Sequence, residues 1–232
     1  MNKRLAKKIL ILAAILALPG FLYYLLTVKG KNRYKPLSFY GPKQVAKTGH
    51  KFHGEYIPDT IYHKLPDFSL TDQDGKPVSS KSLSNNIFIA NFFYTNCSGL
   101  CNTVNNNIKI LLTNYAKNSM VSFLSITVDP ARDSVPVLKR FSKDYPSTGI
   151  KWRFLTGDTS VIYPLARNGF LVNALNAGHG NFIYSDKLIL IDKEKRIRGY
   201  YSGTSNEDLT RLNDEIKVLI AEELRKVDKA LY

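Results

Sequence analysis

The two cysteines of this chain, Cys97 and Cys101, lie where a predicted strand passes into a predicted helix. Residues 87–93 form an almost unbroken apolar run rich in strand-forming residues, which is typical of a buried strand. From Thr103 onward the apolar residues recur at helical spacing. Unpaired backbone N–H groups and the positive end of the helix dipole gather at a helix N-terminus, and both favour a thiolate. The sequence therefore predicts a functional cysteine pair at this junction.

The spacing of the pair leaves its chemistry open. Cysteines four residues apart on a helix have Cβ atoms about 5–6 Å apart, whereas a disulfide needs about 3.5–4.5 Å. A helical pair would have to shift to close a disulfide but can converge on a metal ion, and Gly99 gives the loop freedom for either. Two unrelated core cysteines are the third possibility, but the only two cysteines of a chain rarely share such a junction by accident.

The start of the chain is predicted to lie outside the globular domain. A basic leader at 1–8 precedes residues 9–28, which contain no charged side chain and match the length of a membrane-spanning helix. No clear cleavage site or lipobox cysteine follows, which favours an uncleaved anchor over a signal peptide. Basic residues flank both ends, but a basic leader usually keeps the N-terminus in the cytoplasm. We therefore expect a single-pass anchor in the cytoplasmic membrane, with the domain in the periplasm or an equivalent compartment.

The formal net charge of +14 is concentrated in this first part of the chain. Residues 1–36 carry eight lysines and arginines and no acidic residue. We expect this segment to contact an anionic membrane surface. The rest of the chain is only mildly basic and shows no basic stripe, so no nucleic-acid partner is expected.

Residues 29–62 are predicted to be a tether, because prolines and glycines interrupt any periodicity. His50 and His53 form an H-x-x-H pair there, which could be an accessory metal site. Two solvated histidines are the favoured interpretation, and His63 is interpreted in the same way. The globular domain is then expected over 63–232.

The domain pattern predicts an α/β protein. Strands are expected near 68–70 and at 87–93, 121–128, 153–156, 185–192 and 196–201, and helices from Thr103, from Ser134, over 161–170 and from about Ser205. Helices alternate with strands early and a hairpin closes the chain, which indicates a central mixed sheet with flanking helices. A cysteine pair after the first long central strand favours the thioredoxin-like architecture.

Four stretches carry a resemblance to a known family: 70–76, 91–101, 125–133 and 188–192. Together, C-x-x-x-C after a strand and T-V-D-P-x-R-D resemble the SCO/SenC family over about residues 66–224. Its members are membrane-anchored, thioredoxin-like copper proteins that help assemble the copper centre of cytochrome c oxidase. The resemblance implies copper on Cys97 and Cys101, a histidine as third ligand, and as partner a respiratory oxidase subunit or another copper or thiol protein.

The chain departs from the family at the third ligand. The position that matches the family's histidine is Tyr184, and the nearest histidine, His179, stands five residues earlier between glycines. His179 is a weak candidate for the third ligand, and Tyr184 is expected at the rim of the cysteine pocket. Cu(I) is soft and prefers thiolates, whereas Cu(II) prefers nitrogen or oxygen donors. A phenol is mostly protonated near neutral pH, so we expect Cu(I) to bind better than Cu(II).

A thiol–disulfide oxidoreductase that reduces a partner's copper-binding cysteines is the alternative function. The C-x-x-x-C spacing and the lack of any proline after Pro164 disfavour it, because thioredoxin-type oxidoreductases place a cis-proline opposite the cysteines. Peroxidase chemistry would use Thr95 beside Cys97 but also needs an arginine that the sequence does not place. Among the T-V-D-P-x-R-D residues, Asp133 is expected to cap a helix and Arg132 to pair with an acid.

Overall fold

The computed structural model describes residues 3–25, 36–97, 99–145, 152–178 and 181–230. The chain divides into two compact units, 1–36 and 37–232. The first unit contains helix α1 (Lys3–Tyr24), which includes Pro19. No helix within the described ranges combines the length and hydropathy needed to cross a membrane. The predicted anchor over 9–28 is therefore not supported, since the described helix ends at Tyr24 and residues 26–28 lie outside the described part.

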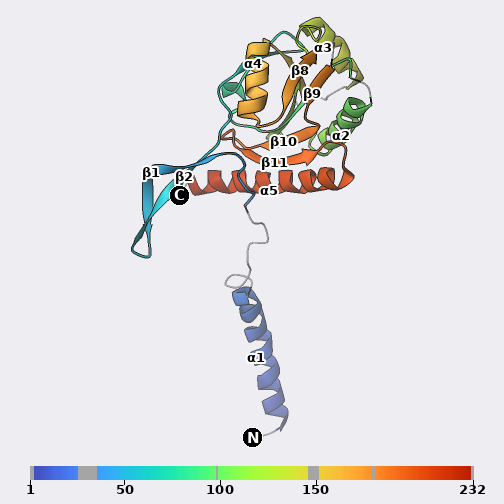
Figure 1. The fold of residues 1–232 in the computed structure, drawn as a ribbon. Helices are drawn as coiled ribbons and strands as arrows, with labels where there is room; N and C mark the ends of the chain where they lie inside the picture. The colour runs from blue at the N-terminus through green and yellow to red at the C-terminus, as the bar shows by residue number, and fades with distance from the viewer. Residues whose placement is uncertain (1–2, 26–35, 98, 146–151, 179–180, 231–232) are drawn as a thin grey trace. The chain divides into compact units, whose positions relative to one another are not determined.

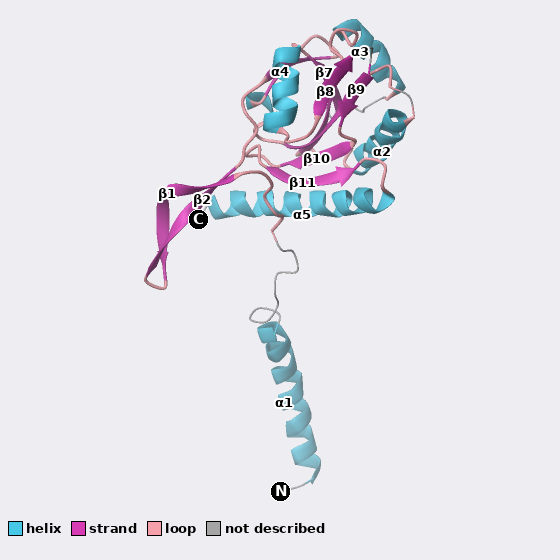
Figure 2. Cartoon of the chain, viewed as in Figure 1, coloured by secondary structure: helices cyan, strands magenta, loops and turns pink. Residues whose placement is uncertain are grey.

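The second unit is built on a seven-stranded mixed sheet (Figures 1 and 2). Its strands are β3 (Ser69–Asp72), β4 (Pro77–Ser79), β5 (Ile87–Phe93), β6 (Val121–Thr127), β7 (Trp152–Thr156), β10 (Lys187–Ile191) and β11 (Ile197–Ser202). Their spatial order is β11-β10-β5-β6-β7-β3-β4. The three central strands β5, β6 and β7 run parallel, and antiparallel hairpins form both edges. Every residue of β5 is buried, as its unbroken apolar run predicts.

Helices cover both faces of the sheet. They are α2 (Leu100–Asn114), α3 (Val135–Phe141), α4 (Thr159–Pro164) and α5 (Asn206–Ala230), with short 3-10 turns η2 (Lys81–Leu83) and η3 (Ser142–Asp144) and a π-type turn η4 (Leu165–Gly169). The apolar sides of α2, α3 and α5 share one buried cluster, while α4 and η4 pack into the other. The predicted α/β fold is confirmed, although α2 begins three residues before the apolar period that indicated it.

The structure contains two hairpins that the sequence analysis missed. The predicted tether includes the hairpin β1 (Lys43–Phe52) and β2 (Glu55–Tyr62), whereas residues 29–35 lie outside the described part. His53 and Gly54 form its tight turn with φ of 49° and 88°, as a two-residue hairpin loop requires. The second hairpin joins β8 (Ala174–Gly178) to β9 (Asn181–Tyr184) as a separate two-stranded sheet.

A buried arginine fixes the start of the second unit against its last helix. The Arg198 side chain, on β11, is only 1% exposed. Its guanidinium donates to the carbonyl oxygens of Leu37 (2.7 Å) and Ser38 (3.3 Å) and lies 2.7 Å from a carboxylate oxygen of Glu222, on α5. The other carboxylate oxygen of Glu222 accepts from the Leu37 N–H at 2.6 Å. Asp192 completes this network at 3.3 Å from Arg198.

Candidate dithiol and metal site

The two cysteines are joined as a disulfide at the N-terminus of α2. The Sγ atoms are 2.03 Å apart and the Cα atoms 5.8 Å apart. Only Cys101 belongs to the helix, because Gly99 at φ +69° is its N-cap and Cys97 precedes it. The Cys97 N–H donates to the Tyr94 carbonyl at 3.2 Å in the turn that follows β5. The spacing argument for a pair within one helix therefore does not apply, and the turn lets the two side chains meet.

Tyr184 lies directly on this disulfide. Its hydroxyl oxygen is 3.0 Å from Cys97 Sγ and 2.9 Å from Cys101 Sγ. Because neither sulfur of a disulfide carries a hydrogen, the phenol must be the donor. The end of β9 supplies Tyr184, and Tyr94 packs edge-on against its ring at 5.7 Å between centroids. The sequence predicted Tyr184 at the rim of the cysteine pocket, and the structure adds that its hydroxyl contacts both sulfur atoms.

Burial raises the pKa of Tyr184 to about 12, and the neighbouring Tyr94 and Asp186 act in the same direction. The phenol is therefore neutral near physiological pH. A neutral phenol can donate a hydrogen bond to a sulfur atom but is a poor ligand for a soft metal ion. At the end of β9 the chain thus presents a hydrogen-bond donor to both sulfur atoms.

We expect this raised pKa to make the protein's stability fall at alkaline pH. The fold favours the neutral phenol, so the contribution is complete below pH about 10, the ordinary tyrosine pKa, and is lost as the pH rises toward about 12. Urea unfolding at pH 9, 10 and 11 compares the wild type with Tyr184→Phe. The wild type should lose more stability over this interval than the variant, because the variant lacks this titration. Parallel pH profiles would contradict the assignment.

Asp133 fixes the turn that leads to Cys97. This buried carboxylate accepts hydrogen bonds from the Thr95 N–H (3.0 Å), the Thr95 hydroxyl and the Thr127 hydroxyl. It does not cap α3, whose N-cap is Ser134 without a side-chain cap. The expected helix-capping role is therefore wrong, because the carboxylate is used between the ends of β5 and β6 instead. The Thr95 hydroxyl is held by Asp133, which gives it a structural role.

Asp129 and Arg132, which belong to the same T-V-D-P-x-R-D stretch as Asp133, form an ion pair. Arg132 Nε lies 3.7 Å from Asp129 Oδ2, which confirms the expected pairing of Arg132 with an acid. Burial and the nearby Asp133 carboxylate raise the pKa of Asp129. The Arg132 side chain is 60% exposed.

The histidines give no third ligand within the described residues. His179 lies outside that part of the chain, so its candidacy stays a prediction from the sequence. His50 contacts Asp59 at 3.2 Å within the hairpin, and His53 forms the hairpin turn. His63 Nε2 contacts the Gly169 carbonyl at 2.7 Å. His50 and His53 are exposed, as expected for solvated histidines, whereas His63 is half-buried against the domain, so its interpretation as a solvated histidine is wrong.

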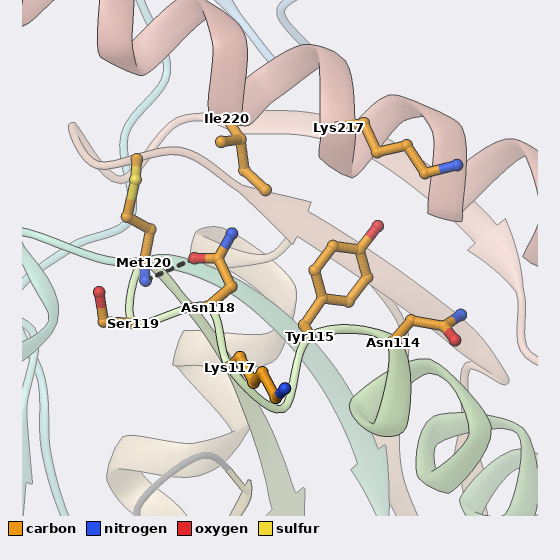
Figure 3. A pocket seen from close by; sticks show the side chains of 8 residues that line it. All are labelled: Asn114, Tyr115, Lys117, Asn118, Ser119, Met120, Lys217 and Ile220. Carbon is orange, nitrogen blue, oxygen red and sulfur yellow. Dashed lines mark hydrogen bonds between the residues drawn. The ribbon is translucent and has the colours of Figure 1, made fainter.

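Two other features of the described residues do not form a functional site. Asp192, Glu194 and Glu223 lie close enough to hold a cation, but Arg196, Arg198 and Lys226 neutralise them as an ion-pair network. A cavity of about 680 Å³ opens between the C-terminal end of α2 and α5 (Figure 3). It is lined by Asn114, Tyr115, Lys117, Asn118, Ser119, Met120, Lys217 and Ile220. At 1.5 Å rise per residue it lies roughly 20 Å along α2 from Cys101, so it does not belong to the disulfide site.

A mixed sheet with helices on both faces, and a cysteine pair at the start of the helix after the first central strand, defines a thioredoxin-like protein. The sequence model of the SCO1/SenC family matches residues 59–220. The chain therefore belongs to the SCO1/SenC family.

Individual relatives agree with this assignment. The chain is 29% identical to an SCO1 homologue of Bacillus subtilis over 167 residues, which are 71% of this chain and 86% of that protein. The structure of BsSco matches this chain with a TM-score of 0.60 and 28% identity, and the match covers 67% of this chain and 92% of that chain. BsSco is described as a member of the Sco family of cytochrome c oxidase assembly proteins with a disulfide switch. Copper-bound ScoI of Arabidopsis thaliana matches with a TM-score of 0.59 and 26% identity, covering 68% and 98%.

Proposed function

We propose that this protein is a copper chaperone that carries copper on Cys97 and Cys101 and helps assemble the copper centre of cytochrome c oxidase. The observation that carries the proposal is the meeting of the two sulfur atoms at a helix N-terminus in a member of the SCO1/SenC family. Two relatives support it, because one was crystallised with copper and another is described as an oxidase assembly protein.

Copper binding requires the disulfide to be reduced first. A dithiol reductant would supply two electrons and two protons, becoming a disulfide itself while Cys97 and Cys101 become thiols. Cu(I) would then displace both thiol protons and bind the two thiolates as cargo. The positive end of the α2 dipole stabilises the thiolates. Because Tyr184 offers a neutral phenol at the third position, we propose that Cu(I) binds well and Cu(II) poorly.

The proposed recipient of the copper is a respiratory oxidase subunit or another copper or thiol protein. Its own cysteines would have to compete with the pair at Cys97 and Cys101 by ligand exchange. The periplasm or an equivalent compartment is the proposed location, since a disulfide persists in an oxidising environment.

A thiol–disulfide reductase is the second candidate function. The closed disulfide and the Tyr184 phenol in contact with it favour this function, because a hydrogen-bond donor can stabilise the thiolate that forms on reduction. The reduced pair would pass two electrons and two protons to a partner disulfide, reducing the partner's copper-binding cysteines and closing Cys97–Cys101 again.

Copper retention tests the chaperone proposal. The full-length protein is reduced, freed of reductant without oxygen, loaded with one equivalent of Cu(I) and desalted. We expect the wild type to keep about one copper per chain, and Cys97→Ser and Cys101→Ser each to lose at least about a hundredfold in affinity, since each removes one of two soft ligands. Unchanged copper retention in the double serine variant would contradict binding at this pair.

The reduction potential separates the two candidate functions. A potential near that of thioredoxin, about −270 mV, with turnover of a partner disulfide and copper lost on desalting, would favour the reductase. Retained copper without such turnover would favour the chaperone.

A further inference from the structure

The register of the β1–β2 hairpin gives it two chemically different faces. Directly paired residues of an antiparallel hairpin share a face. Lys43 pairs with Tyr62, Val45 with Thr60, Gly49 with Pro58, and Lys51 with Tyr56. We call the surface formed by these eight residues the basic–aromatic face. The Lys43 ammonium lies 5.8 Å from the centre of the Tyr62 ring, as expected for neighbours on one face.

Both carboxylates of the hairpin lie on the opposite face. Glu55 pairs with Phe52, and Asp59 follows Ile57 by two residues on the same side of β2. His50 pairs with Ile57 and contacts Asp59 at 3.2 Å, which agrees with this placement. Tyr56 is exposed, whereas the half-buried Tyr62 ring stacks on Phe39 with 4.0 Å between the ring centroids. The basic–aromatic face therefore presents the ammonium groups of Lys43 and Lys51 and the Tyr56 phenol, with no carboxylate among them.

This hairpin is unusually rich in exposed apolar side chains. Eleven large hydrophobic side chains are exposed in the described part of 37–232, and the hairpin carries five of them: Val45, Phe52, Tyr56, Ile57 and Ile61. Val45 is 76% exposed and Tyr56 58%. Val45 and Tyr56 lie on the basic–aromatic face, whereas Phe52, Ile57 and Ile61 lie on the opposite face. A two-stranded hairpin is only marginally stable in water, so exposed apolar side chains on it indicate that it is covered in use, and its charges decide which of the two faces an anionic partner contacts. The family match begins at residue 59, so β1 and the turn lie outside the matched part.

We propose that the basic–aromatic face binds the surface of an anionic lipid bilayer. Tyrosine rings settle at the membrane–water interface, and lysines bind anionic headgroups while their stems cover apolar surface. The carboxylates on the opposite face would be repelled by the same headgroups, so the charges decide which face turns toward the lipid. This face is separate from the cysteine pair, so lipid binding there does not depend on whether that pair carries copper or electrons.

Brominated lipids test the orientation of the hairpin in the full-length protein. One variant carries Tyr56→Trp on the basic–aromatic face, and its matched control carries Ile57→Trp on the opposite face. Trp152 is 1% exposed in the core and supplies a constant background, measured on the parent protein. Vesicles contain phosphatidylcholine and phosphatidylglycerol with brominated acyl chains. Both labels are in one hairpin. The ratio of the quenching in the Tyr56→Trp variant to that in the Ile57→Trp variant therefore reports the orientation of the hairpin even if residues 1–36 also bind the vesicle.

We expect bromine to quench tryptophan at 56 severalfold more than at 57. Adding Lys43→Glu and Lys51→Glu to the Tyr56→Trp variant should lower vesicle affinity of the hairpin by about fivefold or more per lysine, and high salt or purely zwitterionic vesicles should act in the same direction. Equal quenching, stronger quenching at 57, or none at either position would overturn the proposal. A concentration-dependent blue shift of tryptophan at 56 without lipid would instead assign the face to a second copy of the chain. Circular dichroism confirms that each variant is folded.

Discussion

Replacing Tyr184 by histidine is expected to convert a weak Cu(II) site into a strong one. An imidazole at the end of β9 would stand where the phenol now contacts both sulfur atoms, at 3.0 and 2.9 Å. It would add a nitrogen donor to two thiolates, which is the kind of donor that Cu(II) requires. We expect at least about a hundredfold gain in Cu(II) affinity, more than the tenfold to hundredfold that residues supporting a ligand usually contribute. Cu(I) affinity should change much less.

The measurement is a titration of the reduced, full-length protein with each copper ion under anaerobic conditions. A strong thiolate-to-copper charge-transfer band should appear with Cu(II) in Tyr184→His and be weak in the wild type. Tyr184→Phe is the matched control, since it removes the hydroxyl without adding a nitrogen. A wild type that already binds Cu(II) tightly and stoichiometrically would contradict the proposed preference, unless His179→Ala abolished that binding.

Replacing Asp133 by alanine is expected to cost at least about 3 kcal/mol of folding free energy. The carboxylate accepts from the Thr95 N–H and from the hydroxyls of Thr95 and Thr127, and all three donors would lose a charged acceptor at once. Because Thr95 stands two residues before Cys97, the turn that carries this cysteine should also loosen. Urea unfolding measures the loss, and the rate of disulfide reduction by dithiothreitol should rise.

Two further variants distinguish the loss of the Asp133 hydrogen bonds from the loss of a negative charge alone. Asp144→Ala removes an exposed carboxylate and should change stability by less than about 0.5 kcal/mol. Thr95→Val removes one of the three donors while keeping the side-chain volume. Its loss of folding free energy should lie between the losses of Asp144→Ala and Asp133→Ala. If Asp133→Ala were as stable as Asp144→Ala, the carboxylate would have no role in holding the turn.

The sheet could be predicted because its strongest signals are local. The apolar run of β5 and the helical period of α2 gave the central element of the fold, and the closing strands gave the edge hairpin. The β1–β2 hairpin was missed because its apolar residues are exposed rather than packed, so no buried face imposes strict alternation on β1. Its turn at His53 and Gly54 was the one signal that could have found it.

Only part of the disulfide site could be predicted from the sequence. The cysteines were found because they are the only two in the chain, but their bonding state depends on Cys97 lying before the helix, which spacing alone does not reveal. The contact of Tyr184 with both sulfurs depends on where β9 ends, and no sequence period indicated β9. Asp133 was assigned to the nearest helix, whereas its partners lie 38 and 6 residues away along the chain.

The contacts of Arg198 decide where the chain can be shortened. The sequence alone placed the beginning of the domain at residue 63. The Leu37 and Ser38 carbonyl oxygens, which accept hydrogen bonds from the Arg198 guanidinium, lie before that point in the chain. Cutting there would remove the acceptors at Leu37 and Ser38 and leave a cation in the interior with only its carboxylate partners. Glu222 would lose the backbone donor that now holds α5 at that end. The smallest piece that keeps this interior charge satisfied begins at Leu37.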